Sequence, residues 1–311
     1  MSGARLRGSI CVVGSINVDT TFGVPRIPAP GETVLASRRA VAAGGKGANQ
    51  AVAAAALGGL VSFIGCVGAD RDGAYALEAL RARGVDVSDV DSRDDAPTGT
   101  AMVLVAPNGE NVIVVDQGAN GHVDPLRVEA RLPVDRPVVM LAQLETNLDA
   151  VLAAARSSGS ATFILNPAPT SMPSTALGEI LAYTDVMVPN RTELAWLAGA
   201  ETPRTSSEVD DCVAALDFAG HVIVTLGGDG AVMYEAGRER RGVLIAPVTV
   251  ETIDTSGAGD AFCGALGHCL AAGDKLDSAV RRANQVAAWT TTLHGAQIPE
   301  GKTSVLLGAD V

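Results

Sequence analysis

The sequence predicts an α/β protein in which helices cover both faces of a largely parallel central sheet, with a small separate β-sheet beside it. Short apolar runs alternate with longer amphipathic or alanine-rich segments, which is the pattern of buried parallel strands joined by helices. A second group of β-like segments, bounded by proline and glycine, lies outside this alternation. The 311 residues suffice for one large domain, residues 1–311, that carries a small insertion.

The main sheet is expected to take its strands from the short apolar runs, at residues 9–14, 61–67, 138–141, 162–165, 185–188 and 222–224. Helices are expected at residues 51–57, 72–83 and 278–293, and in a segment that ends at Arg156. In such sheets ligands bind beyond the carboxyl ends of the strands. The polar or glycine residues that follow these strands are Asn17, Asp19, Glu145, Asn190, Glu193, Thr225 and Gly227.

The small sheet is expected to form a lid. Its four β-like segments are residues 20–24, 33–40, 100–105 and 111–115, and the last two are joined by the turn Pro107-Asn108-Gly109. The two inserted segments, at about residues 17–42 and 97–118, would close over a substrate and exclude water. Because exposed strand edges favour pairing with another chain, a homodimer through the lid is expected.

Composition excludes several classes of protein. The net charge of −12 and the lack of a basic block argue against a nucleic-acid partner. No apolar stretch is long enough to span a membrane or to form a signal-peptide core, so a cytoplasmic location is expected. The five cysteines show no close metal-type pairing and are interpreted as reduced core residues. Only Cys263, near a predicted helix start, has a position that lowers a thiol pKa.

Residues 254–260, Asp-Thr-Ser-Gly-Ala-Gly-Asp, run directly into an apolar, helix-forming segment. The N–H groups of Gly257, Ala258 and Gly259 can converge on an anion at the start of that helix. Asp260 follows them, where the helix dipole is expected to keep it ionised and able to accept a proton. The alternative is a glycine-rich turn in which Asp260 is an ordinary charge at a helix N-terminus.

Residues 44–50, Gly-Gly-Lys-Gly-Ala-Asn-Gln, form a second glycine-rich stretch. Its glycines let the backbone approach a ligand, and Lys46 and Asn49 supply hydrogen-bond donors beside the next helix. A Walker phosphate loop is excluded because Lys46 is followed by Gly47 and not by Ser or Thr. Asn17 and Asp19 point the same way if extended, which suits vicinal hydroxyls. The alternative for residues 44–50 is a flexible linker, and the alternative for Asn17 and Asp19 is a solvated loop.

With these residues in view, the chain resembles the PfkB family of carbohydrate kinases, and within it the ribokinase group, over nearly its whole length. Residues 44–50 and 254–260 look like the family's two characteristic motifs. Residues 14–19, 143–145, 190–193 and 295–297 match the pattern besides. The resemblance implies a ribokinase-like three-layer α/β/α domain with a β-sheet lid. It also implies transfer of the ATP γ-phosphoryl group to a sugar's primary hydroxyl, the 5-hydroxyl of D-ribose being favoured.

The resemblance further implies roles for single residues. Asp260 would be the base that takes the hydroxyl proton, while the N–H groups of Gly257, Ala258 and Gly259 stabilise the transferred phosphoryl group. The sugar would be held by Asn17, Asp19, Gly45, Lys46, Asn49 and Glu145. The nucleotide would be bordered by Asn190, Thr225, Gly227, Gly228, Gly230, Gly259 and Asn284.

Two cations are implied by the same resemblance. Asn190 and Glu193 would organise Mg²⁺ through water, because Mg²⁺ keeps much of its hydration shell. K⁺ would be bound mostly by backbone carbonyls of Asp254, Ser256, Thr290, Leu293, Gly295 and Pro299. The chain departs from the family pattern at Leu293, where a basic residue is frequent, and at Pro299, where a hydroxyl is expected. Carbonyl ligation depends little on the side chain, so Leu293 matters little, whereas the Pro299 position stays open.

Other functions remain as alternatives. A PfkB-type kinase of deoxyribose, a hexose, a sugar acid or a nucleoside would differ only in the shape of its pocket, although Asp19 beside two hydroxyls favours ribose over 2-deoxyribose. A non-catalytic sugar sensor would be expected to lack Asp260 or the preceding glycines, and both are present. A dinucleotide-dependent oxidoreductase needs Gly-x-Gly-x-x-Gly after the first strand, which Gly14-Ser15-Ile16 does not provide.

Overall fold

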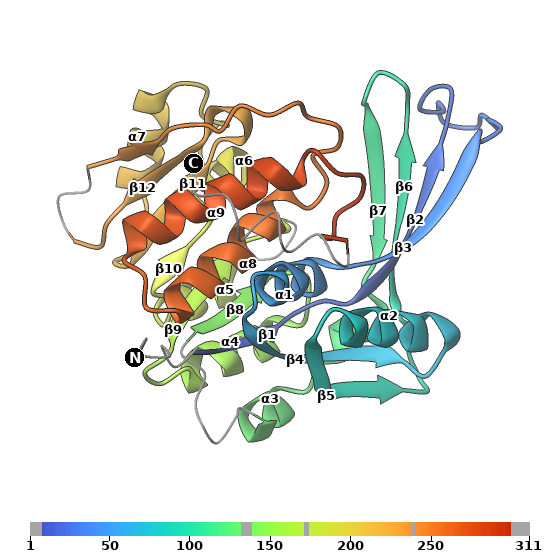
Figure 1. The fold of residues 1–311 in the computed structure, drawn as a ribbon, viewed down its shortest axis with the longest axis horizontal. Helices are drawn as coiled ribbons and strands as arrows, with labels where there is room; N and C mark the ends of the chain where they lie inside the picture. Colours follow the sequence, from blue (N-terminus) through green and yellow to red (C-terminus); the bar gives the residue numbers. More distant parts are fainter. Residues whose placement is uncertain (1–7, 132–138, 171–173, 238–240, 300–311) are drawn as a thin grey trace, which may run out of the picture.

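The computed structural model describes residues 8–131, 139–170, 174–237 and 241–299. Within these ranges the larger sheet has nine strands in the order β13-β12-β11-β10-β9-β8-β1-β4-β5 (Figure 1). The run from β11 to β5 is parallel, and β12 and β13 are antiparallel at one edge. The strands are β1 Ser9–Val13, β4 Leu60–Gly68, β5 Val85–Arg93, β8 Val139–Gln143, β9 Thr162–Asn166, β10 Val186–Met187, β11 His221–Thr225, β12 Ala231–Tyr234 and β13 Val243–Ile245.

Helices cover both faces of this sheet. One face carries α1 Lys46–Ala56, α2 Arg71–Ala82, α8 Ala258–Ala271 and α9 Leu276–Thr290. The other carries α3 Pro125–Arg131, α4 Leu148–Ser157, α5 Ser174–Leu181, α6 Arg191–Ala198 and α7 Ser206–Ala214. Strand β1 shows why both faces are covered. Ile10 and Val12 pack against the helices of the first face, and Cys11 and Val13 pack against those of the second. Alternate residues of a buried strand point to opposite faces, so an all-apolar run needs helices on both sides.

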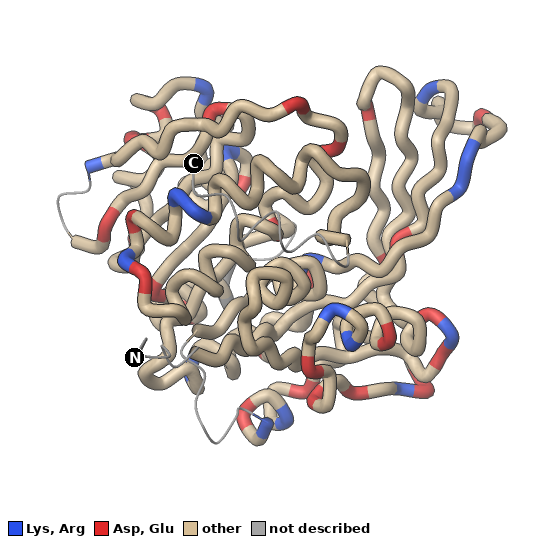
Figure 2. The backbone as a smooth tube through the Cα atoms, viewed as in Figure 1, with Lys and Arg blue, Asp and Glu red and all other residues tan. Residues whose placement is uncertain are grey.

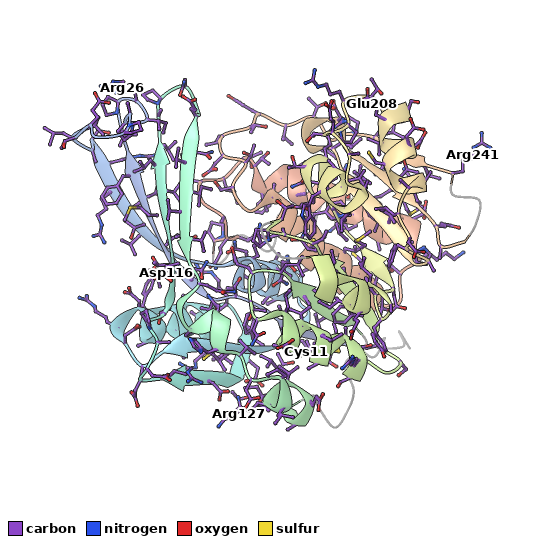
Figure 3. All side chains as sticks on the ribbon, turned by 180° about the vertical axis from the view of Figure 1, so that it is seen from behind. Cys11, Arg26, Asp116, Arg127, Glu208 and Arg241 are labelled. Carbon is purple, nitrogen blue, oxygen red and sulfur yellow. The ribbon has the colours of Figure 1, made fainter. Side chains whose placement is uncertain are left out.

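The smaller sheet has four strands in the described residues, in the order β3-β2-β6-β7. They are β2 Asn17–Gly23, β3 Arg38–Gly44, β6 Gly99–Val105 and β7 Asn111–Asp116. Strands β2 and β6 are parallel, and each pairs with an antiparallel outer strand. The sheet stands beside the main body, with Arg26 at its far end and Asp116 at its base (Figure 3). Only three residues separate the end of β1 from the start of β2, so this sheet leaves the main body at the carboxyl end of a central strand.

Three local predictions were wrong. The strand predicted at residues 33–40 begins at Arg38 and runs to Gly44, because its pairing with β2 continues to Asn17. The helix predicted at residues 51–57 already begins at Lys46, directly after Gly45, whose φ of 92° is not helical. Lys46 and Asn49 therefore lie within a helix and not before one. Strand β5 was not predicted, since its alternating acidic residues are typical of an exposed edge.

The cysteines are buried and unpaired, as predicted. The expectation that the helix start lowers the thiol pKa of Cys263 was wrong, because burial inside α8 and the nearby charge of Asp260 raise that pKa well above its ordinary value. Among the described helices, none combines the length and apolarity that crossing a membrane requires.

Candidate active site

The start of α8 is a turn that requires glycine. Gly257 is the N-cap, with a left-handed φ of 72°, and a Cβ there would lie 2.3 Å from the carbonyl oxygen of Ala296. The N–H groups of Gly257 and Gly259 have no acceptor among the described residues. Ala258 departs from the prediction, because its N–H donates a 3.3 Å hydrogen bond to the carbonyl of Thr255. This helix start therefore presents at least two free amides to an anion.

Asp260 lies in the first turn of α8 and is only 7% exposed. Asn49 Nδ2 donates to its Oδ2 at 3.0 Å, and Gln50 Nε2 donates to its Oδ1 at 3.2 Å. Burial raises the pKa of Asp260 above the ordinary value, which opposes the effect expected of the helix dipole. The charge of Lys46 and the two amide hydrogen bonds oppose that rise. A buried carboxyl with a raised pKa is a competent proton acceptor at neutral pH.

Glu145, which follows β8, joins the glycine-rich stretch to the end of β1. Its Oε2 accepts hydrogen bonds from Ser15 Oγ at 2.5 Å and from the N–H of Lys46 at 2.9 Å. The charge of Asp260, followed by that of Glu145, raises the pKa of Lys46, although burial opposes the rise. Lys46 therefore stays protonated and supplies a cation beside these two carboxylates. Gly45 packs closely against the start of β2. A Cβ at this position would lie 2.8 Å from the backbone nitrogen of Asn17.

Asn17 and Asp19 lie on β2, two residues apart. Asn17 Oδ1 accepts from Asn120 Nδ2 at 2.8 Å. Asp19 Oδ1 is buried and has no hydrogen-bond partner among the described residues. Burial, followed by the charges of Glu145 and Asp260, raises the pKa of Asp19 to about 7. A buried acceptor without a partner needs an explanation, and a role in accepting a hydrogen bond from a ligand hydroxyl would be one.

A cavity of about 480 Å³ opens beside the N-terminus of α8. Six of the seven residues predicted at the nucleotide line it, and Asn190 does not; the six are Thr225, Gly227, Gly228, Gly230, Gly259 and Asn284. Asn284 Nδ2 donates to the carbonyl of Ala246 at 2.9 Å, which fixes it at the cavity wall. The apolar wall from Pro247 to Val250, with Phe262 and Ala287, was not predicted, because its sequence has no recognisable motif.

Asn190 and Glu193 form a capping box at the start of α6. Glu193 Oε2 accepts from the N–H of Asn190 at 2.8 Å, and Asn190 Nδ2 donates to Glu193 Oε1 at 2.8 Å. Burial raises the pKa of Glu193 above its ordinary value, although the N–H of Asn190 and the charge of Lys46 oppose the rise. Asn190 also bridges to Thr225 in the sheet. The pair therefore lies at the carboxyl end of β10, next to the residues that line the cavity.

The residues predicted to hold a monovalent cation lie around one loop. Asp254 Oδ1 accepts from the N–H of Ser256 at 2.9 Å, and Oδ2 accepts from the N–H of Gly295 at 2.9 Å. Burial raises the pKa of Asp254, but these two bonds, together with the Ser256 hydroxyl and the charge of His294, outweigh it and hold the pKa below the ordinary value. The carbonyl of Thr290 accepts from the N–H of Leu293 at 3.1 Å. Pro299 lies in irregular backbone at the end of the described residues.

Three buried amides beside Asp260 were not assigned a role from the sequence. Gln50, Gln143 and Asn166 connect α1 to the carboxyl ends of β8 and β9 by hydrogen bonds. Gln143 and Asn166 could have been found, since both end predicted strands. Gln50 has no such signal, because its contacts depend on how closely α1 approaches α8.

The chain is similar to known proteins over nearly its whole length. Residues 7–303 match the family described as pfkB family carbohydrate kinase. A ribokinase from Haemophilus influenzae is 36% identical over 296 residues, covering 94% of this chain and 95% of that protein. A deoxyribokinase from Salmonella typhi is 32% identical, covering 93% and 94%. The structure of Arabidopsis thaliana ribokinase complexed with ribose and ATP has a TM-score of 0.81 and 29% identity, covering 97% of this chain and 99% of that one.

The chain therefore belongs to the pfkB family of carbohydrate kinases. The three-layer α/β/α fold with its second, small sheet confirms the predicted fold class. Membership identifies the protein as a kinase that phosphorylates a hydroxyl group of a sugar.

Proposed function

We propose that the protein transfers the γ-phosphoryl group of ATP to the 5-hydroxyl of D-ribose, giving ribose 5-phosphate. The observation that carries this proposal is the position of Asp260 between two sets of groups. Its carboxylate is bonded to Asn49, on the side of Lys46, Glu145 and Asp19. The preceding residue, Gly259, lines the cavity of about 480 Å³ beside the N-terminus of α8. An alcohol on the first side and a terminal phosphate on the second would meet at Asp260.

In this mechanism Asp260 accepts the proton of the ribose hydroxyl as its oxygen attacks the γ-phosphorus. The bond from that phosphorus to the bridging oxygen breaks, and ADP leaves. The free N–H groups of Gly257 and Gly259 stabilise the charge on the transferred oxygens. Catalysis of this kind depends mainly on positioning and electrostatics. Asp19 and Asn17 would hold the vicinal hydroxyls, and the partnerless Oδ1 of Asp19 supports this role.

Both cations belong to this proposal. Mg²⁺, which neutralises phosphate charge when bound, would be held near Asn190 and Glu193. Because both oxygens of Glu193 already accept hydrogen bonds from Asn190, water-mediated ligation fits this pair better than direct ligation. K⁺ would be held by the carbonyls around residues 254–256 and 290–295. Asp254 supports that site, since its carboxylate fastens the two segments together.

Two further properties are proposed. The chain forms a homodimer through the small sheet, which acts as a lid formed by residues 17–42 and 97–118. Exposed apolar residues on its strands, such as Met102 at 52% and Val114 at 64%, support this assembly. The protein works in the cytoplasm, and its five unpaired, buried cysteines support a reducing compartment.

A panel of alcohols tests the substrate. Purified protein with ATP and Mg²⁺ is assayed on ribose, 2-deoxyribose, hexoses, a sugar acid and nucleosides, and kcat/KM is compared. Ribose is expected to have the highest value, because 2-deoxyribose leaves an oxygen of the buried Asp19 without its hydroxyl partner. A higher kcat/KM on 2-deoxyribose, a nucleoside or a hexose would replace ribose while leaving the kinase chemistry intact.

Asp260→Asn tests the base. This variant is expected to bind ribose and ATP nearly as well as the parent, while kcat falls by about two to four decades, the usual span for a lost general base. Single-turnover rates and calorimetric binding separate the two effects. Near-normal turnover by Asp260→Asn would remove Asp260 from its role.

A further inference from the structure

Two neighbouring amides of α1 hold the two oxygens of Asp260. Asn49 Nδ2 bonds Oδ2, and Gln50 Nε2 bonds Oδ1. Asn49 already has a proposed role at the sugar, whereas nothing so far accounts for Gln50. The Gln50 side chain is completely buried, at 0% exposure. Burying a primary amide is costly unless its polar atoms find partners, so the partners of Gln50 should explain why it is there.

Every polar atom of the Gln50 amide has a partner. Its Oε1 accepts from Gln143 Nε2 at 2.7 Å, and its Nε2 donates to Asn166 Oδ1 at 3.4 Å as well as to Asp260. The direction of these bonds is fixed at the far end, because Asn166 Nδ2 donates to the carbonyl of Val188 at 3.0 Å and a carbonyl can only accept. Asn166 must therefore turn its oxygen toward Gln50, and Gln50 must turn its nitrogen toward Asp260.

The chain of amides ends in an unsatisfied atom. Gln143 Oε1 is buried and has no hydrogen-bond partner in the part of the chain that the structure describes. Such an atom destabilises the fold, and its presence calls for a reason. The reason is directional: Gln143 must give its N–H to Gln50 so that Gln50 can give its own to Asp260. The arrangement keeps the hydrogen bond from Gln50 to Asp260 and leaves Gln143 Oε1 without a hydrogen-bond partner.

Glycines bring these groups together. Gly264 lies one turn after Asp260 on the same face of α8, and a Cβ there would be 2.3 Å from the carbonyl oxygen of Gln50. A Cβ on Gly14 would be 2.2 Å from Gln143 Oε1. Any larger residue at either position would push α1 or Gln143 away. The close packing of α1 against α8 therefore sets the distance between Gln50 and Asp260.

We propose that Gln50, oriented by Gln143, is a positioning residue for Asp260, which it holds in place and keeps ionised by donating to Oδ1. This inference rests on the proposed function, in which Asp260 is the base. Burial removes the water that would otherwise solvate the carboxylate, and the Gln50 N–H replaces it. With Oδ1 bonded to Gln50 and Oδ2 to Asn49, the remaining lone pairs face the alcohol.

The charged and titratable groups around Asp260 come from several elements: Lys46 on α1, Glu145 after β8, Asp19 on β2, Glu193 on α6 and Cys263 on α8. The acids among them oppose ionisation of Asp260, and Lys46 favours it. A hydrogen bond to the charged form adds to the effect of Lys46. Loss of Gln50 should therefore lower the fraction of ionised Asp260 at a given pH, besides loosening its orientation.

Gln50→Met tests this inference, because methionine has a similar length and no donor. The kcat of the variant should fall roughly 10- to 100-fold, which is the range for a lost hydrogen bond to a charged group. The KM for ribose should change by less than about threefold, since Gln50 contacts no sugar group in the proposal. The acidic limb of the kcat profile should move to higher pH. Thr184→Val is the control, since it removes a buried hydroxyl bonded to Ile180 at the opposite end of the sheet.

Gln143→Met is the second variant, and it carries the test if Gln50→Met does not fold. It keeps Gln50 but removes the donor that orients it, so kcat and the acidic limb should change in the same direction by a smaller amount. An unchanged kcat, a loss confined to KM, or an acidic limb that does not move would overturn the inference. Assaying Asp260→Asn in parallel separates a failure of the role of Gln50 from a failure of the proposed function. If Asp260→Asn is inactive and Gln50→Met is normal, only the role of Gln50 fails, whereas an active Asp260→Asn contradicts the proposed function itself.

Discussion

Asp19 is a residue whose folded surroundings oppose its own ionisation. Burial and the nearby charges of Glu145 and Asp260 raise its pKa from 3.8 to about 7. One of its oxygens has no partner in the described structure. Residues that break the usual rules of stability in this way are concentrated at functional sites. Asp19 is therefore expected to reduce stability in the absence of ligand and to contribute strongly to ligand binding.

Asp19→Asn should make the ligand-free protein more stable at alkaline pH. The folded pKa lies above the unfolded value, so the folded state binds more protons between about pH 4 and pH 7, and this group's contribution to stability falls as pH rises through that window. Asparagine cannot ionise and escapes this loss. The Tm of Asp19→Asn should exceed that of the parent by several degrees at pH 8, with the difference shrinking near pH 4. The same variant should bind ribose much more weakly in calorimetry.

Asp70→Asn is the matched control with the opposite sign. Burial raises the pKa of Asp70, but hydrogen bonds from Thr98 and Gly73 outweigh it and leave that pKa below the ordinary value. A lowered folded pKa stabilises the protein above the unfolded pKa, and this contribution is lost as pH falls through the folded value. Asp70→Asn should therefore lower the Tm at pH 8. If Asp19→Asn lowered the Tm at pH 8 as well, the account of Asp19 would be wrong.

At the level of elements, helix α8 shows what sequence can predict about this site. Asp260 and the preceding glycines could be placed because a change from small residues to apolar helical sequence marks a helix start locally. The direction of the pKa shift of Asp260 could not be predicted, since burial in the folded core, which opposes the helix dipole, is not a local property. The same limit applies to Gln50, whose contact with Asp260 depends on the glycine at position 264 of another helix.

Gly257→Ala should damage the anion-binding turn without unfolding the protein. Alanine at φ 72° is strained, and its Cβ would lie 2.3 Å from the carbonyl oxygen of Ala296, so the turn must move. We expect kcat to fall at least about tenfold, because a small displacement of oriented N–H donors lowers catalysis strongly. Gly84→Ala is the control: its φ of 79° gives comparable strain, but a Cβ there meets nothing within 4 Å. Equal activity of the two variants would show that the contact with Ala296 is unimportant.

The loop at residues 254–256 should make the enzyme respond to monovalent cations. Replacing sodium buffer by potassium buffer at equal ionic strength is expected to raise kcat, because a cation among the carbonyls would support the adjoining helix start. Asp254→Ala should weaken or abolish the difference between the two buffers, since it releases the N–H groups of Ser256 and Gly295 that Asp254 now binds. Equal rates for the parent protein in both buffers would count against the site.

At the scale of the whole molecule, the small sheet has two different faces. Strand register places Val41, Thr20, Met102 and Val114 in one row across the four strands, so these side chains share a face. Asp19 is the neighbour of Thr20 on β2 and therefore points to the opposite face, which is the face of the candidate sugar site. The inner strands β2 and β6 carry little charge, and so does the outer strand β7 (Figure 2). The face turned away from the site thus presents an exposed apolar row.

An apolar row of this kind needs a cover, and in the proposed homodimer a second copy of the same sheet would supply one. Val41, Met102 and Val114 are 41%, 52% and 64% exposed, and large exposed apolar patches mark interaction sites. Covering the row with its twin would make a symmetric, self-complementary contact, which is the commonest form of dimer. The contact would also restrict the motion of both lids, because each lid would close against a partner sheet and not against water.

Met102→Lys should therefore convert the proposed homodimer into a monomer, measured by sedimentation or by light scattering after size exclusion. Its charge would be buried without a partner at the centre of the contact, and the cost of that burial exceeds what a small apolar interface supplies. The KM for ribose should rise in the monomer, since an unsupported lid closes less readily, while kcat at saturating ribose should change less. Leu126→Lys is the matched control, because Leu126 is 73% exposed on α3, outside the small sheet. A parent protein that is already monomeric at micromolar concentration would contradict the dimer. A dimer that survives Met102→Lys would show that the interface lies on another surface.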